Sequence, residues 1–288
     1  MSYIICTDSS CDLSPSYIDA HPLKVLGLMY TINGETFEDD NFRAITPKSF
    51  YDRIRQGQTS KTTLINTERY VEFFTPILQQ GEDILYVGFS SGLSGSVQSA
   101  MIAANQLKEQ FPQRDIRVVD TLAASLGQGL LVHYALANQA KGMSLADNAK
   151  WLEDHKLNLA HWFTVDDLNH LRRGGRISAT TAILGTMLSI KPVMHMDNEG
   201  HLIAMSKTRG RKQSLKALVE EMGRLVVHPE AQDIFISHGD CLEDAQYVGS
   251  LIQQRFPVQS ITYHEVGPVI GSHTGPGVVA LFFMGDHR

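Results

Sequence analysis

Three stretches rich in hydroxyl groups and glycine carry the residues of this chain best suited to bind an anion. They are residues 59–63 (TSKTT), 90–96 (SSGLSGS) and 271–275 (GSHTG), which together offer hydroxyls, backbone amides and one imidazole. The second stretch follows an apolar run at 84–89 that fits a buried strand, and it precedes an amphipathic segment at 97–111. A Ser/Gly loop between a strand and a helix presents free N–H groups and hydroxyls to a ligand, so it predicts an anion site. Alternatively, Ser94 or Ser96 simply caps the following helix.

Two nucleotide-binding motifs are absent from the sequence, and their absence narrows the class of anion that the three stretches are expected to bind. No GxxxxGK[ST] occurs, and no GxGxxG follows the first predicted strand, so nucleotide sites of these two kinds are not expected. Neutral hydroxyls can hold a carboxylate by hydrogen bonds without a fixed ion pair. Recognition of a carboxylate therefore fits the three stretches.

Acyl hydrolysis is the enzymatic alternative. Ser94, Asp240 and His273 follow one another in the chain order Ser, Asp, His that α/β-hydrolases use. The nucleophile elbow of those enzymes needs GxSxG, whereas residues 92–96 read GLSGS, with the second glycine one position early. A serine acyl hydrolase that uses Ser94 and His273 stays open as an alternative.

Composition places the chain among globular proteins of two ordinary domains. It has 288 residues, 43% of them hydrophobic, and a net charge of -6, which gives no reason to propose nucleic-acid binding. No apolar run approaches the length of a transmembrane segment, and the N-terminus lacks the basic start of a signal peptide. The three cysteines show neither CxxC nor metal-ligand spacing, so we expect free thiols in a reducing cytoplasm and no metal site.

The order of predicted elements changes near residue 157. Before it, strands at 2–7, 24–32, 84–89 and 115–119 alternate with helices at 46–56, 67–80, 97–111 and 144–155. This alternation predicts a Rossmann- or flavodoxin-like domain with a mostly parallel sheet over residues 1–157. After it, a short helix at 166–170, a hairpin at 192–197 and 201–206, and strands at 159–165, 233–238, 260–266 and 278–284 predict a mixed α/β domain over 158–288. Residues 267–277 read as a glycine-rich loop.

Two basic clusters stand out in this acidic chain. Arg172, Arg173 and Arg176 surround a glycine pair, and Lys207, Arg209 and Arg211 form the second cluster. Arginines beside glycines suit contact with phosphate or an acidic partner, and solvated loops are the alternative. The apolar segments 122–136 and 183–190 could line a tunnel, although ordinary core is the alternative for each residue.

Several motifs in order along the chain carry a resemblance. They are TDSSCDL at 7–13, SSGLSGSVQSA at 90–100, DT at 120–121, LRRGGRIS at 171–178, KP at 191–192, KTRG at 207–210 and GPVIGSHTGPG at 267–277. With these motifs the chain resembles the DegV family of bacterial fatty-acid-binding proteins.

The resemblance implies a lipid carrier, without catalysis of its own, that buries a fatty acid between and within two α/β domains. Such carriers present the carboxylate to a fatty-acid kinase, which makes an acyl phosphate for phospholipid metabolism. The ligand would be a long-chain acid of the palmitate, stearate or oleate type, with no further cofactor. A kinase-independent lipid sensor is the alternative.

The resemblance also implies residue roles. The head group would contact Thr59 or Thr62, Ser91 or Ser94, and His273. We expect the kinase to dock on Arg172, Arg173, Arg176, Lys207 and Arg209. One departure concerns the first stretch, which often reads TSQPS in the family and here reads TSKTT, so which threonine contacts the ligand is left open.

Overall fold

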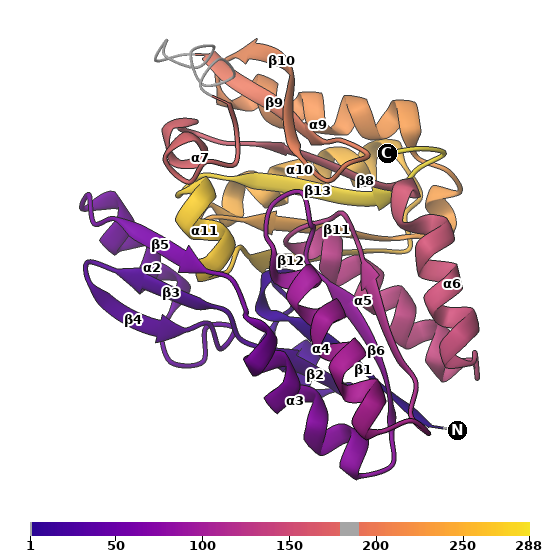
Figure 1. The fold of residues 1–288 in the computed structure, drawn as a ribbon. Coiled ribbons are helices and arrows are strands. Elements are labelled where there is room, and N and C mark those ends of the chain that lie inside the picture. Colours follow the sequence, from indigo (N-terminus) through magenta and orange to yellow (C-terminus); the bar gives the residue numbers. More distant parts are fainter. Residues whose placement is uncertain (1, 179–189) are drawn as a thin grey trace.

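The computed structural model describes residues 2–178 and 190–288 and has an α/β fold with three sheets (Figure 1). The first sheet is parallel throughout, in the order β2-β1-β6-β7. Its strands are β1 (Tyr3–Asp8), β2 (Leu23–Leu26), β6 (Asp83–Gly88) and β7 (Ile116–Asp120). One face packs against α3 (Thr67–Gln79) and α4 (Ser96–Gln110), and the other against α5 (Leu126–Ala140) and α6 (Leu145–His155). The predicted parallel sheet is confirmed.

The second sheet has six strands in the order β10-β9-β8-β13-β11-β12 and is mixed. Its strands are β8 (Leu159–Thr164), β9 (Ile190–Met196), β10 (Leu202–Arg209), β11 (Asp233–His238), β12 (Ser260–Glu265) and β13 (Val279–Met284). Helices α9 (Arg211–Leu225) and α10 (Leu242–Arg255) cover one face. The mixed α/β character of this part is confirmed, while the domain boundary after residue 157 stays a prediction.

Helix α5 lies between the two large sheets and packs against strands of both. Its glycines make this close packing possible. A Cβ on Gly127 would lie 2.8 Å from the ring of Phe282, and one on Gly129 would lie 2.7 Å from the carbonyl oxygen of Cys11. The small residues in this helix therefore bring the sheets together with little space between them.

The segment predicted as one strand at 24–32 is divided between two sheets. β2 ends at Leu26, and β3 (Met29–Ile32) belongs to a third, antiparallel sheet in the order β4-β3-β5. Gly27 lies at the break, where a Cβ would meet the carbonyl oxygen of Asp39 at 2.6 Å. The expected turn at Asn33-Gly34 joins β3 to β4 (Glu35–Glu38), with positive φ at both residues. Helices α1 (Pro15–Asp19) and α2 (Pro47–Arg55) begin with Ser14 and Thr46 as N-caps.

Three predicted loops contain regular structure. Residues 60–63 form β5 (Ser60–Thr63), because pairing with β3 supplies backbone hydrogen bonds that the polar sequence does not reveal. Most of the loop at 267–277 is α11 (Pro268–Thr274), which begins with proline in its first turn. The cationic loop at 171–178 begins inside α7 (Asn169–Arg173), a short helix that starts three residues later than expected. Lys207 and Arg209 lie in β10.

A buried carboxylate links the two large sheets. Asp12 accepts hydrogen bonds from the hydroxyl of Ser125 at the start of α5 (2.5 Å) and from the amide of Gly267 at the start of α11 (3.0 Å). The Ser125 oxygen also lies 3.0 Å from the hydroxyl oxygen of Ser237 in β11. Burial raises the pKa of Asp12 well above its usual range, and the charges of Asp39 and Asp8 act in the same direction.

Asp39 makes stability depend on pH. Burial raises its pKa to about 7, although it accepts a hydrogen bond from the amide of Asn41. The folded carboxyl keeps its proton to a higher pH than the unfolded one, whose pKa is about 3.9. Its contribution to stability is therefore present below about pH 4 and is lost as the pH rises through about 7.

We expect Asp39→Asn, which stays neutral, to remove this dependence. Between about pH 5 and about pH 8 the wild type loses the stability that the raised pKa of Asp39 provides, and the variant does not. The decrease in the free energy of unfolding over this range should therefore be smaller in the variant, by roughly 3 kcal/mol. Urea titrations at both pH values measure the difference. Asp154→Asn, at an exposed position of α6, is the control and should follow the wild type. Parallel pH profiles for all three proteins would contradict the assignment.

Candidate functional site

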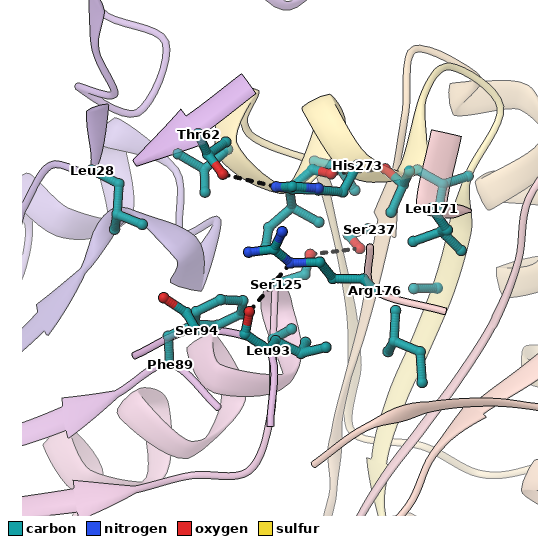
Figure 2. A pocket seen from close by; sticks show the side chains of 18 of the residues that line it. Leu28, Thr62, Phe89, Leu93, Ser94, Ser125, Leu171, Arg176, Ser237 and His273 are labelled. Carbon is teal, nitrogen blue, oxygen red and sulfur yellow. Dashed lines mark hydrogen bonds between the residues drawn. The ribbon is translucent and has the colours of Figure 1, made fainter. Parts of the chain in front are cut away.

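A cavity of about 290 Å³ lies where the three sheets and α11 meet (Figure 2). We call it the acyl chamber, after the ligand that the sequence resemblance implies, and we define it by the residues that line it. Most are apolar and come from every part of the fold: Leu28, Phe89, Leu93, Phe163, Leu171, Leu202, Val269, Ile270 and Ala280. The fold thus places a small apolar space directly beside the predicted anion-binding stretches.

One end of the acyl chamber is polar. Thr62 from β5, Ser94 from the loop after β6, and His273 from α11 all line it. The Thr62 hydroxyl lies 2.8 Å from Nε2 of His273 (Figure 2). The Ser94 hydroxyl lies 2.9 Å from that of Ser96, which in turn accepts the amide of Ile65. The structure therefore brings one group from each of the three stretches to a single place.

Gly174 explains how His273 reaches this place. A Cβ on Gly174 would lie 2.2 Å from Nδ1 of His273, so only glycine allows the backbone after α7 to approach the imidazole this closely. The first glycine of the RRGGR sequence therefore serves packing against α11.

The electrostatics of the polar end combine a neutral imidazole with one guanidinium. Burial and, to a smaller extent, the nearby charge of Arg176 lower the pKa of His273 to about 4, so the ring is neutral near pH 7. Arg176 is half-buried and donates from Nε to the carbonyl of Leu93 (3.2 Å) and from Nη1 to that of Gly174 (2.5 Å). A carboxylate here would meet hydroxyls and one positive charge without a bidentate ion pair.

A second, more polar cavity of about 510 Å³ adjoins the first. We call it the outer cavity. Its wall includes Thr59, Lys61, His170 and Arg173, and it shares Thr62, Arg176 and His273 with the acyl chamber. These three shared residues therefore form a partition between an apolar space and a cationic one.

Comparison with known proteins places this arrangement in a family. The family model described as "Uncharacterised protein, DegV family" matches residues 2–286. The chain belongs to the DegV family. A DegV domain-containing protein of Clostridium perfringens is 45% identical over 286 residues, which cover 99% of this chain and 98% of that protein.

Solved DegV structures are similar over nearly the whole chain. One from Thermus thermophilus, described by its fatty-acid binding, has a TM-score of 0.87 at 29% identity and covers 99% of this chain and 100% of its own. One from Ruminococcus gnavus, refined with vaccenic acid, has a TM-score of 0.88 at 25% identity and covers 98% of this chain and 99% of its own. The fold of this DegV protein is therefore that of proteins that bind fatty acids.

The predicted head-group residues of this DegV protein divide into two sets. Thr62, Ser94 and His273 line the acyl chamber. Thr59 is exposed and lines only the outer cavity, whereas Ser91 lines neither cavity and its amide donates to Asp120. Of the three threonines in residues 59–63, Thr62 and Thr63 line the acyl chamber, and Thr62 is the one whose hydroxyl lies within hydrogen-bond distance of His273.

The residues predicted to dock a kinase differ in their exposure and contacts. Arg172 and Arg173 are exposed on α7, and Lys207 and Arg209 are exposed on β10. Arg176 instead points into the acyl chamber, and Arg211 forms ion pairs with Asp244 (2.8 Å) and Asp166 (3.7 Å).

The contacts of a hydrolytic triad do not form. The Ser94 hydroxyl is bonded to Ser96, while Nε2 of His273 is bonded to Thr62. Nδ1 of His273 has no hydrogen-bond partner among residues 2–178 and 190–288, and the Asp240 carboxylate pairs with Arg55. This geometry gives the hydrolase alternative no support.

Other expectations concern metals, membranes and the chamber wall. Among the described residues no cluster of three metal-ligating side chains occurs, and no helix there has the length and apolar character needed to span a bilayer.

Of the two segments expected to line a tunnel, 122–136 contributes Ala124 and Ser125 to the acyl chamber. In the other, residues 183–189 lie outside the described residues.

Some chamber residues could not be singled out from the sequence. His161 in β8 and Ser237 in β11 both face the acyl chamber from the mixed sheet. Their only signal is a polar residue on the inward side of a strand that is otherwise apolar, and without the sheet order that side is unknown.

Proposed function

We propose that this protein binds a long-chain fatty acid and presents its carboxylate for phosphorylation. The hydrocarbon chain would occupy the acyl chamber, and the carboxylate would lie against Thr62, Ser94 and His273. The observation that carries this proposal is the partition. Thr62, Arg176 and His273 line both the apolar chamber and the cationic outer cavity, so a carboxylate held by them faces both.

The two ends of the ligand would play different energetic roles. Burial of an acyl chain contributes about 0.8 kcal/mol per methylene, so ~14 methylenes give roughly 11 kcal/mol before the costs of binding. A hydrogen bond to a charged group adds only about 1.5–3 kcal/mol. The chain should therefore dominate affinity, and the head-group contacts should orient the carboxylate.

The neutral state of His273 suits this orienting role. A neutral imidazole has one N–H and one lone pair, so Nε2 can donate to Thr62 while the Thr62 hydroxyl donates onward to the carboxylate. Ser94 supplies a second hydroxyl, and Arg176 supplies the charge. Because no carboxylate–guanidinium fork is required, the oxygen that must attack a phosphoryl group keeps a free lone pair.

The outer cavity is where a phosphoryl donor would approach. Lys61 and Arg173 contribute positive charge to it, next to the partition. A fatty-acid kinase would dock on the exposed Arg172, Arg173, Lys207 and Arg209, since such charges orient a partner more than they stabilise a fold. The acyl phosphate would then enter phospholipid synthesis in the cytoplasm, a compartment that suits the three free cysteines.

Loss of single head-group hydroxyls tests the orienting role. We expect Thr62→Val and Ser94→Ala each to weaken fatty-acid binding by only about 1–2 kcal/mol, because the carboxylate keeps its other partners. Transfer of phosphate to the bound acid by a fatty-acid kinase should fall further than binding does. Ser99→Ala, at a half-buried position of α4 that lines neither cavity, is the control. The competing hydrolase role predicts turnover of p-nitrophenyl esters that disappears with Ser94→Ala, and such turnover would contradict the carrier role.

A further inference from the structure

His161 is a polar group inside the apolar part of the acyl chamber. It lines the chamber from β8 and is only 4% exposed. Its Nδ1 has no hydrogen-bond partner among residues 2–178 and 190–288. The rings of Phe282 (4.6 Å) and Phe163 (5.6 Å) pack beside it and offer no hydrogen-bonding atom. Buried polar atoms in proteins are nearly always paired, so this one calls for an explanation.

Of the other polar groups that line the chamber, Nδ1 of His273 at the polar end is also unpaired among the described residues, whereas Ser125, Ser237 and Thr274 are hydrogen-bonded within the protein. Ser125 and Ser237 are joined to each other and to Asp12, and Thr274 donates to the carbonyl of Ile270. His161 therefore differs from these three residues, because it lines the chamber and has a ring nitrogen with no hydrogen-bond partner among the described residues.

The sheet register gives the depth of His161. In the strand register, His161 in β8 lies opposite Phe282 in β13. Two residues along β8, Phe163 lies opposite Ala280 in β13, and Ala280 lies opposite Ser237 in β11. Arg176 follows the carboxyl end of β8, and His273 precedes the start of β13. His161 thus lies one pleat repeat, about 7 Å, further from the polar end than the row of Phe163 and Ser237. A ligand atom beside it belongs to the chain and not to the head group.

We propose that the chamber accepts a fatty acid bearing an oxygen function, such as a hydroxyl, near the middle of its chain, and that His161 hydrogen-bonds this oxygen. This inference rests on the proposed binding of a fatty acid in the chamber. Burial lowers the pKa of His161 well below its usual value, so the neutral ring offers one donor and one acceptor, which match the two roles of a hydroxyl. A saturated chain leaves the ring unpaired.

Three ligands test the proposal on the delipidated full-length protein: stearic acid, 10-hydroxystearic acid and 2-hydroxystearic acid. Competition against a fluorescent fatty acid gives each Kd. The wild type should bind the 10-hydroxy acid within about threefold of stearic acid, although burying an unpaired hydroxyl would weaken it far more. His161→Phe keeps an aromatic ring and should raise the Kd of the 10-hydroxy acid about tenfold or more relative to the Kd of stearic acid, while the ratio for the 2-hydroxy acid stays as in the wild type.

His195→Phe is a matched control. His195 is also buried, and its Nδ1 also has no hydrogen-bond partner among the described residues. It lies opposite Trp162 in the strand register, so its side chain is on the other face of the sheet from His161 and does not line the chamber. It should leave all three affinities unchanged, and His161→Gln should restore part of the hydroxyl preference.

Three results would overturn the proposal. The wild type could bind stearic acid but reject the 10-hydroxy acid, in which case fatty-acid binding stands and the role of His161 fails. His161→Phe could bind both equally well, with the same conclusion. Failure of every acid to bind would overturn the proposed function as well. The wild-type comparison decides the matter even if His161→Phe does not fold.

Discussion

Replacement of Ala280 by tryptophan is expected to abolish fatty-acid binding and leave the fold intact. Ala280 lies in β13, is 3% exposed and lines the acyl chamber. An indole at this position would project into the space that we assign to the acyl chain. The acyl chain of the ligand supplies most of the affinity, at about 0.8 kcal/mol per buried methylene. If the indole excludes a few methylene groups from the chamber, fatty-acid binding should weaken more than ~100-fold.

Uptake of stearic acid by delipidated protein, followed by native mass spectrometry, measures this effect. Ala146→Trp, at an exposed position in the first turn of α6, is the matched control and should bind normally. Melting temperatures of both variants separate lost binding from lost folding. Wild-type affinity in a folded Ala280→Trp protein would place the acyl chain elsewhere.

Reversal of charge at Arg172 and Arg173 should have the second large effect, on coupling to a kinase. Both side chains are exposed on α7, and no ion pair to a carboxylate is found for either among the described residues; Arg173 contacts His170 at 2.9 Å. Arg172→Glu with Arg173→Glu should leave fatty-acid affinity within about threefold of the wild type. It should lower acyl-phosphate formation by a fatty-acid kinase by about 100-fold or more, because it replaces attraction with repulsion.

The control for this pair is Lys108→Glu with Lys141→Glu. These residues are exposed near the C-terminal ends of α4 and α5 and carry the same change in charge. Higher salt should weaken the wild-type reaction in the same direction as the charge reversal. Unchanged turnover in the Arg172/Arg173 variant would refute docking on α7. Lost lipid binding would instead mean that these arginines hold the chamber together.

The parallel sheet and its helices could be predicted because their signals are local. The apolar run at 84–89 became the buried strand β6, and the helix after SSGLSGS begins at Ser96, one residue from the predicted start. β5 could not be predicted, since its residues, SKTT, are polar and form a strand only by pairing with β3. The same holds for α11, because the four glycines and two prolines of residues 267–277 suggested a loop.

The same distinction between local signals and long-range pairing applies to the residues of the site. Thr62, Ser94 and His273 stand in polar stretches, so residue type and family resemblance were enough to propose them. His161 and Ser237 sit inside strands, where only the three-dimensional register shows which residues face the chamber. Arg176 was expected on a docking surface, but Figure 2 shows it pointing into the chamber, where its guanidinium donates to the carbonyls of Leu93 and Gly174.

Native mass spectrometry of the purified wild-type protein is the most direct test of the central claim. We predict one non-covalent adduct per chain with the mass of a long-chain fatty acid, which disappears on delipidation and returns on addition of stearic acid. Solvent extraction of the denatured protein should release the same acid. A protein that carries no fatty acid when purified, and that takes up none after delipidation, would contradict the account.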